Sequence, residues 1–284
     1  MKRAVHLAIF FIAALAIAGL IAGCGNSSSD LTPAQSLTSD SGAGASTVMQ
    51  GASATVTDAS YSSADLPLAD GTLLQYASNR AGAAVQVYFD LEGPWKFTSG
   101  PQETTLKVAT ARIDTAPQQQ EFPNASVSTY SYWASASSSI RSASGSEYLF
   151  QGKDDSAWTI YGRVTADGRA ITYSNPSKAL AFPLTAGESW TDSYTETDDN
   201  GKTDVIAENT VLARNRLTVP AGSFDAWLLQ TKISSKTRGE TITSIDYSWF
   251  VPGIGRAAEI ISLPGERNPN FSSARAFYRL KSYQ

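Results

Sequence analysis

Short runs in which apolar and polar residues alternate constrain the fold of this chain more than any other feature. Aromatic and β-branched residues recur at every second position over 84–91, 106–110, 228–233, 242–250 and 257–263, and this period is typical of half-buried strands. Turn signals separate the runs: Asp167-Gly168, Asn200-Gly201, Pro220-Ala221-Gly222, Pro252-Gly253 and Pro264-Gly265. About a dozen strands over about 220 residues fit a single domain. The pattern predicts an all-β, mostly antiparallel fold, built as a curved sheet or an open barrel.

A weak internal repeat accompanies these strands. Residues 66–71 read Leu-Pro-Leu-Ala-Asp-Gly, and residues 182–187 read Phe-Pro-Leu-Thr-Ala-Gly. Each segment leads into bulky strand residues, because proline suits the entry to a strand and glycine permits the tight turn. The repeat is compatible with two related halves divided near residue 175, and equally with chance similarity.

The beginning of the chain has the pattern of a secretory signal peptide. Lys2 and Arg3 precede an apolar run over residues 7–21, and small residues then lead to Cys24, which is the one cysteine in the chain. The run is shorter than the roughly 20 apolar residues that a transmembrane helix needs. We therefore predict a signal peptide over residues 1–23.

Cys24 follows Ile21-Ala22-Gly23, and this motif resembles the lipobox of bacterial lipoproteins. The resemblance implies cleavage before Cys24, acylation of its thiol with a palmitate-type chain, and acylation of the new amino terminus. Gly25 stands where an aspartate would favour retention in the inner membrane, so the resemblance implies an outer-membrane lipoprotein that faces the periplasm or the cell surface. The membrane is then a partner through the acyl anchor.

The composition changes abruptly after this anchor. Over residues 25–64, 27 of 40 residues are Gly, Ser, Thr or Ala, and Lys, Arg and Glu are absent. So few large apolar groups cannot offset the entropy of ordering the chain. We predict a flexible tether over residues 24–64 and a β domain over residues 65–284.

The remaining composition excludes several classes of function. Lys2, Arg3 and His6 leave with the signal, so the mature chain has 20 basic and 26 acidic residues, a net charge of −6, and no histidine. The charge gives no reason to expect nucleic acid as a partner. Without histidine, Ser-His-Asp triads and zinc sites built on histidine or cysteine are excluded. We predict no catalytic residue, no cofactor and no metal site, although paired carboxylates of the glycosidase type stay possible.

Three groups of residues are candidate binding elements. Residues Glu196–Asp204 approach the order of a calcium loop, but Glu196 and Ala207 occupy positions that need Asp and Glu, so a solvated hairpin tip is favoured. Basic and aromatic residues near the end of the chain share one strand parity, which is typical of a solvated face: Arg275, Phe277, Arg279 and Lys281. Aromatic residues that could line a ligand cavity, or simply fill a core, are Trp95, Trp133, Trp158, Trp190, Trp227, Trp249, Tyr130, Tyr132, Tyr148, Tyr161 and Tyr247.

The second half of the chain carries three motifs in order. Gly187-Glu188-Ser189-Trp190 comes first, Val219-Pro220-Ala221-Gly222-Ser223-Phe224 follows, and Phe250-Val251-Pro252-Gly253-Ile254-Gly255 comes last. The series resembles that of a family of uncharacterised bacterial lipoproteins, over about residues 180–262. The resemblance implies a curved antiparallel sheet that is distantly similar to the open barrels of lipoprotein carriers, and it implies no catalytic residues.

These observations favour a non-enzymatic lipoprotein that maintains the envelope or binds an apolar or amphiphilic ligand. The ligand or partner would be a lipid, a lipoprotein or a glycan. Two other classes stay open: an envelope enzyme that acts on glycans through two carboxylates, and a surface adhesin or glycan-binding module. Two acidic side chains facing each other across a groove would indicate the enzyme, and flat exposed aromatic residues would indicate the adhesin.

Overall fold

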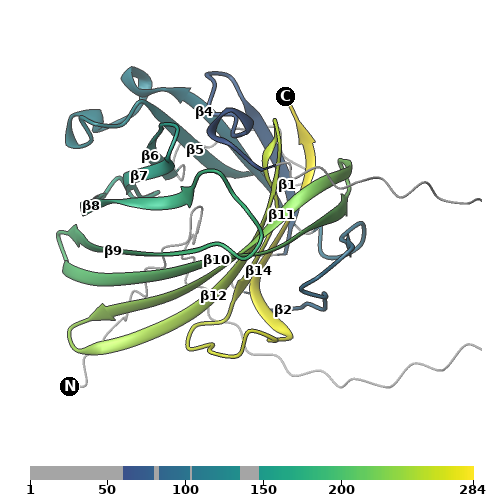
Figure 1. Ribbon diagram of the computed structural model, residues 1–284. Coiled ribbons are helices and arrows are strands. Elements are labelled where there is room, and N and C mark those ends of the chain that lie inside the picture. Colours follow the sequence, from purple (N-terminus) through teal and green to yellow (C-terminus); the bar gives the residue numbers. More distant parts are fainter. Residues whose placement is uncertain (1–59, 80–82, 103, 135–146) are drawn as a thin grey trace, which may run out of the picture. The chain divides into compact units, whose positions relative to one another are not determined.

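The computed structural model describes residues 60–79, 83–102, 104–134 and 147–284, which form a β barrel (Figure 1). The predicted signal peptide, Cys24 and the predicted tether up to residue 59 lie outside these residues. In the described part, helical structure is limited to short 3₁₀ turns at Ser63–Asp65, Ile113–Thr115 and Gln119–Glu121. None of the helices in the ranges just given is long and apolar enough to cross a bilayer.

One antiparallel sheet accounts for the barrel. In spatial order its strands are β1 (Leu73–Ser78), β4 (Thr104–Arg112), β5 (Val127–Ala134), β6 (Glu147–Lys153), β7 (Ala157–Val164), β8 (Ala170–Ala181), β9 (Ser189–Asp198), β10 (Gly201–Val219), β11 (Gly222–Thr237), β12 (Glu240–Val251), β13 (Gly255–Ser262) and β14 (Ser273–Tyr283). The first strand, β1, pairs with the last, β14, so the sheet closes on itself. The predicted all-β, antiparallel fold is confirmed.

The strands follow the alternating runs and turn signals of the sequence. The predicted runs at 106–110, 228–233, 242–250 and 257–263 fall within β4, β11, β12 and β13. The run at 84–91 pairs as a strand only at β2 (Val85–Gln86). Two-residue turns join β9 to β10 and β10 to β11, which is the shortest connection that antiparallel neighbours use.

Residues 83–102 cross the outer face of the barrel, and we call this segment the strap. β2 pairs with β14, and β3 (Trp95–Lys96) pairs with β10 in parallel. Phe89, Trp95 and Phe97 all contact Trp249, with ring centroids 5.4, 5.9 and 4.9 Å away. Burial of such large rings is among the strongest stabilising contributions to a fold. The strap therefore gives the barrel a second apolar core on its outer side.

The sheet is weakest between β8 and β9. These strands pair only through residues 172–173 and 196–197, whereas β10 pairs with β11 along nearly its whole length. Figure 1 shows β8 and β9 diverging beyond this short ladder.

Beyond this ladder, residues 174–181 of β8 and residues 189–195 of β9 do not pair with each other. We call these two stretches the seam. Side chains of β9 replace part of the missing ladder. The Lys178 amide donates to the Asp192 carboxylate at 2.9 Å, and the Trp190 indole donates to the Lys178 carbonyl at 3.1 Å. The seam is thus held by side chains, which can move more easily than a continuous backbone ladder.

The two similar segments of the sequence adopt the same local structure. The amide of Gly71 donates to the carbonyl of Thr110 at 3.0 Å, and that of Gly187 donates to Val211 at 2.7 Å. Both glycines have a positive φ, +86° and +90°, which side chains with a Cβ rarely adopt. Each segment leads into a strand, β1 or β9, that begins a run of six barrel strands in the chain.

The packed part of the chain begins before residue 65. Tyr61 is fully buried and exchanges two backbone hydrogen bonds with Leu184, at 3.3 and 2.8 Å. Its ring contacts Trp227 and Phe250. Residues 61–64 therefore belong to the structured domain and not to a free spacer.

Candidate binding site in the barrel interior

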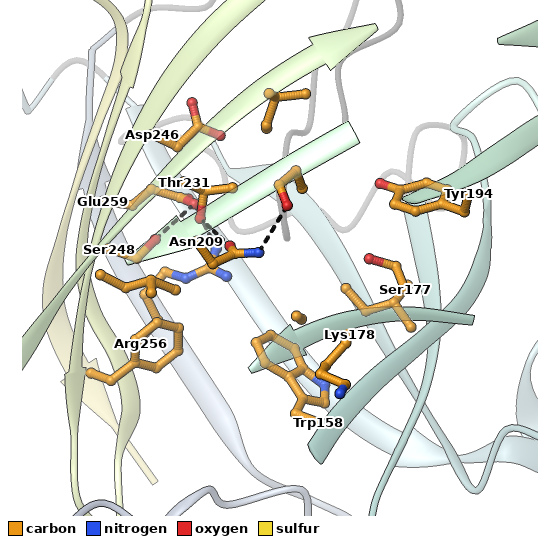
Figure 2. Close-up of a pocket in the computed structure, with 16 residues that line it drawn as sticks. Trp158, Ser177, Lys178, Tyr194, Asn209, Thr231, Asp246, Ser248, Arg256 and Glu259 are labelled. Carbon is orange, nitrogen blue, oxygen red and sulfur yellow. Dashed lines mark hydrogen bonds and ion pairs between the residues drawn. The ribbon is translucent and has the colours of Figure 1, made fainter. Parts of the chain in front are cut away.

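A cavity lies inside the barrel, enclosed mainly by β7, β8 and β10 to β13 (Figure 2). Together with the open solvent at its mouth, it comprises about 510 Å³ of space between atoms. One part of its wall is apolar and is made by Trp158, Ile160, Leu229, Ile233 and Phe250. Another part is polar and is made by Asn209, Thr231, Asp246, Ser248, Arg256 and Glu259. Ser177, Lys178 and Ala179 of the seam complete the lining.

The alternation of β12 explains why polar groups point inward. Tyr247 and Trp249 face the strap, because both rings contact Phe89. Asp246 and Ser248 have the opposite parity and line the cavity. Successive side chains of a strand point to opposite faces, and here both faces are covered. The apolar parity therefore packs on the outside of the barrel, and the polar parity is buried within it.

Hydrogen bonds satisfy most of the polar wall. The Thr231 hydroxyl donates to the Asn209 side-chain oxygen at 2.8 Å, and the Ser248 hydroxyl donates to Glu259 at 3.4 Å. Arg256 donates to the same Glu259 oxygen at 2.8 Å. Burial raises the pKa of Glu259 to about 7, although Arg256 opposes this shift. Arg256 and Glu259 are thus held to each other within this wall.

Asp246 is the exception in the polar wall. Its side chain is buried, with a residue exposure of 3 %, and neither carboxylate oxygen has a hydrogen-bond partner. Burial raises its pKa to about 8; the charge of Arg275 lowers this pKa, that of Glu259 raises it, and that of Arg256 lowers it. A buried polar group without a partner is costly, so Asp246 marks the position in the cavity where a ligand group would be stabilised.

A second hollow lies on the other side of Trp158, Phe250 and Arg256, which line both cavities. Leu66, Pro67 and Leu68, which precede β1, line it. The Tyr76 hydroxyl lies there and donates to the Arg256 carbonyl at 2.7 Å. The Arg256 backbone and side chain are therefore held from two sides.

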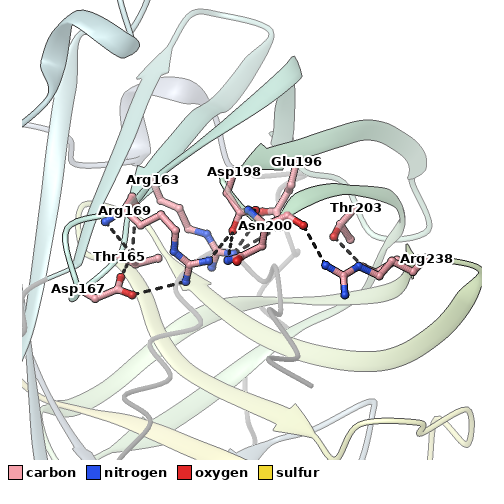
Figure 3. A network of polar contacts seen from close by, with 10 residues as sticks. Arg163, Thr165, Asp167, Arg169, Glu196, Asp198, Asn200, Thr203 and Arg238 are labelled. Atoms are coloured by element: carbon pink, nitrogen blue, oxygen red, sulfur yellow. Dashed lines mark hydrogen bonds and ion pairs between the residues drawn. The ribbon is translucent and has the colours of Figure 1, made fainter. Parts of the chain in front are cut away.

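A buried polar cluster lies where β7, β8 and β9 meet (Figure 3). Arg163 and Glu196 form an ion pair at 3.4 Å, and both are largely buried. Tyr173, directly opposite Glu196 in the ladder, stacks on Tyr194 with ring centroids 4.7 Å apart. Burial raises the pKa of Glu196, while the charge of Arg163 lowers it. Glu147 has a similar environment, in which burial raises its pKa to about 7.

The acidic stretch Glu196–Asp204 forms a hairpin, and its carboxylates do not converge. Glu196 points into the barrel, Asp198 accepts from the Asn200 amide at 2.8 Å, and Asp204 accepts from Thr195 at 2.9 Å. Asp199 and Asn200 form the exposed tip. Within the described residues, no group of three acidic, histidine or cysteine side chains could hold a metal ion. The favoured interpretation of a solvated tip is correct for residues 199–200 but wrong for Glu196.

The predicted aromatic residues serve four different purposes. Trp158 lines the cavity, and its indole donates to Gln151 at 2.7 Å. Trp95 of the strap packs on Trp249 of β12, and Trp190 bridges the seam. Trp227 is buried under the Arg214 guanidinium, 4.6 Å from its ring. The side chains of Tyr130, Tyr132 and Trp133 lie outside the described residues.

Phe277 and Arg279 of the basic parity of β14 are buried, which corrects the expectation of a solvated face, whereas Lys281 is exposed. Arg279 is fully buried beneath the strap, where its guanidinium donates to the carbonyls of Phe97 and Pro101. Phe277 is also buried and packs against Phe97 at 5.2 Å. The alternation of these residues is evident in the sequence of β14. The strap that covers this face lies elsewhere in the chain, so the sequence of β14 does not show it.

Sequence reasoning missed the interior charges, namely Glu147, Arg163, Asp246, Arg256 and Glu259. Asp246 stands in the run Ile245-Asp246-Tyr247-Ser248-Trp249, where polar residues at alternate positions are typical of a solvated face. The strap was the one available signal that both faces of the sheet are covered. An aromatic segment with little strand pairing must cover some apolar surface. That signal does not identify which strands it covers.

Comparisons with known proteins place few limits on this site. No family model matches the chain, and no curated protein matches it at a significant level. One similar solved structure is a "putative exported protein with YmcC-like fold" from Bacteroides fragilis, 12% identical, with a TM-score of 0.42, covering 77% of this chain and 98% of that one. Another is a "putative lipoprotein" from Parabacteroides distasonis, 13% identical, with a TM-score of 0.41, covering 80% and 100%. At this degree of identity and overlap, neither protein indicates what this chain binds.

Proposed function

We propose that the protein is a non-enzymatic lipoprotein of the bacterial envelope that holds a small amphiphilic ligand inside its barrel. The cavity supports this proposal because its wall has an apolar part beside Trp158 and a polar part beside Asp246. Ligand sites typically combine an apolar lining with a few placed polar groups. The seam gives the ligand a route, since Ser177 and Lys178 belong both to it and to the cavity lining.

We further propose that Cys24 anchors the protein to the outer membrane by its acyl chains. The lipobox and the missing aspartate at position 25 support this location. Several acyl chains hold a protein far more firmly than one, since each buried CH₂ contributes about 0.8 kcal/mol. A binding barrel beside a bilayer is well placed to exchange amphiphiles with it.

The arrangement of the interior carboxyls favours binding over glycan hydrolysis. Asp246 and Glu259 lie on neighbouring strands of one wall, β12 and β13. Glycosidases place their two carboxyl groups on either side of the scissile bond, about 5–10 Å apart. Asp246 and Glu259 share one wall and are not opposed in this way, which supports the non-enzymatic proposal.

Native mass spectrometry of the full protein, extracted from its own membrane, tests this function. We expect a retained small molecule whose mass exceeds that of the acylated chain. Trp158→Ala should lower the retained fraction, because it removes the largest apolar side chain of the cavity wall. Trp95→Ala is the matched control, because Trp95 belongs to the strap and packs on the outer face of the barrel against Trp249. A protein that carries no ligand from its membrane, and takes up none of the amphiphiles offered to it, would contradict the proposal.

A further inference from the structure

Charged groups surround one buried carboxyl inside the barrel. Among the described residues, the charge of Glu259 raises the pKa of Asp246, and the charges of Arg275 and Arg256 lower it. In a medium of low polarity a buried carboxyl is stabilised by a bound proton, by hydrogen-bond donors or by a cation.

Two of the interior carboxyls are already engaged. Glu196 is paired with Arg163 at 3.4 Å, and Glu259 is paired with Arg256 at 2.8 Å. Asp246 accepts no hydrogen bond at either oxygen, and it is buried and lines the cavity. Figure 2 shows its carboxyl group at one end of the polar wall, apart from the bonded groups. Both oxygens of one buried carboxyl in the cavity wall are thus unused acceptors.

We propose that the cavity recognises a small amphiphile with a protonated primary amine, whose ammonium group donates hydrogen bonds to Asp246. This inference deepens the proposed function and rests on it. A primary ammonium is a compact donor of up to three hydrogen bonds, so it can engage both carboxylate oxygens. The apolar part of the ligand would lie against Trp158, Ile160 and Phe250, which form the apolar wall.

A neutral alcohol is the chemical alternative, since a hydroxyl also donates. It offers one hydrogen bond and no charge, so it does not stabilise the ionised form of Asp246 as a cation does. A carboxylate ligand would add a negative charge beside Asp246 and Glu259 and is disfavoured by Coulomb repulsion. The three head groups therefore rank amine, alcohol and carboxylate.

Binding of the amine should release a proton from Asp246. Burial raises the pKa of this group to about 8, so the free cavity holds it protonated at neutral pH. The charged groups that act on it are Arg275 of β14 and Arg256 and Glu259 of β13. From β11 it is faced by Thr231, its uncharged partner in the ladder. An ammonium stabilises the ionised form, and the proton leaves for the solvent.

Calorimetry on the full acylated protein in lipid nanodiscs tests the inference with three ligands of equal chain length: hexylamine, hexan-1-ol and hexanoate. Empty nanodiscs correct for partitioning into the bilayer. At pH 8.5 we expect hexylamine to bind at least about tenfold more tightly than the other two, since a charge-assisted hydrogen bond is stronger than a neutral one. Its affinity should rise about tenfold per pH unit from pH 6 to 8, because less work is needed to ionise Asp246 as the pH rises. The amine itself does not change, since hexylamine, like a lysine side chain, stays protonated over this range.

Asp246→Asn should reduce hexylamine binding to the level of the alcohol and remove the pH dependence. Asp225→Asn is the matched control, because the Asp225 side chain is 64 % exposed on the surface, beside Arg214. Independently of any variant, the binding heat of the wild-type protein should differ between phosphate and Tris buffers by the heat of transferring one proton. This measurement keeps the inference testable if the variant fails to fold.

Equal binding of all three ligands, or pH-independent binding of the amine, would overturn the inference and leave the proposed function intact. A neutral or anionic amphiphile retained in native mass spectrometry would do the same. Failure of every ligand, together with an empty protein from the membrane, would instead remove the proposed function on which the inference rests.

Discussion

Asp246 and Glu259 make the stability of the folded chain dependent on protonation. Their folded pKa values are about 8 and about 7, while an unfolded chain gives about 3.9 and 4.3. A raised carboxyl pKa means that the folded state binds more protons in the window between these values. The stabilising contribution is therefore complete below about pH 4 and is lost as the pH rises through 7 to 8.

We expect the melting temperature to fall as the pH is raised from 5 to 9, by at least about 5 °C for a domain of this size. Thermal unfolding followed by circular dichroism measures this fall. Asp246→Asn should make the curve flatter, because it removes the group with the larger shift, whereas Asp225→Asn should leave the curve unchanged. A melting temperature that is constant or rising over this range would show that these carboxyls ionise without cost.

At the scale of residues, the sequence indicated which strand residues share a face of the sheet. It did not indicate whether that face meets water or protein. Ile245 and Asp246 alternate as a half-buried strand should. Whether the polar position meets water or protein depends on what lies opposite, and here other strands of the closed barrel lie opposite. Arg279 is buried in turn because the strap lies opposite it, where a solvated residue is the ordinary expectation.

At the scale of elements, the seam between β8 and β9 is where we expect the barrel to open. Its backbone amides rely on side-chain acceptors, as Lys178 relies on Asp192. Hydrogen exchange requires that an amide lose its acceptor, and local openings occur where few backbone hydrogen bonds hold. We expect the seam amides to exchange faster than those of the long β10–β11 ladder.

Asp192→Ala should accelerate exchange at the Lys178 amide by about tenfold or more, because it removes one charge-assisted hydrogen bond. Hydrogen exchange read by NMR gives the rate at this amide. Asp204→Ala is the control: Asp204 accepts a hydrogen bond from the Thr195 side chain and none from the seam backbone. An unchanged Lys178 rate would mean that the seam does not open through this contact.

The strap was the element least accessible to sequence reasoning. Its residues 84–91 alternate like a strand, yet only Val85 and Gln86 pair with β14. Phe89 and Phe97 instead insert into the outer core, against Trp249. The turns, in contrast, were predictable, because Pro220 and the glycines near it act through local backbone geometry.

For the chain as a whole, the anchor at Cys24 determines where the barrel works. We expect Cys24→Ser to abolish acylation and to release the protein from the membrane fraction, since the acyl chains are the predicted attachment. Fractionation and intact mass measure the two effects. Ser27→Ala, in the predicted tether, should change neither result. A Cys24→Ser protein that still sediments with the outer membrane would show attachment through the folded domain.

The two halves of the barrel connect the sequence to the closed architecture. Each half begins with a Pro-Leu-x-x-Gly segment and contributes six strands, starting at β1 and β9. Similar local sequence gives the same glycine turn in both places, because the turn needs a residue that tolerates positive φ. Closure by the pairing of β1 with β14 joins residues more than 190 positions apart.

The sequence by itself determined the strand class, the turn positions, the tether-like composition and the candidate acylation site, because each depends on residues that are neighbours in the chain. Only the tertiary structure decided which parity became the interior, which charges were buried together, and that Asp246 has no partner. Those properties depend on contacts between distant strands, and a local period cannot specify them. The proposed binding chemistry follows from the second set, and the proposed location from the first.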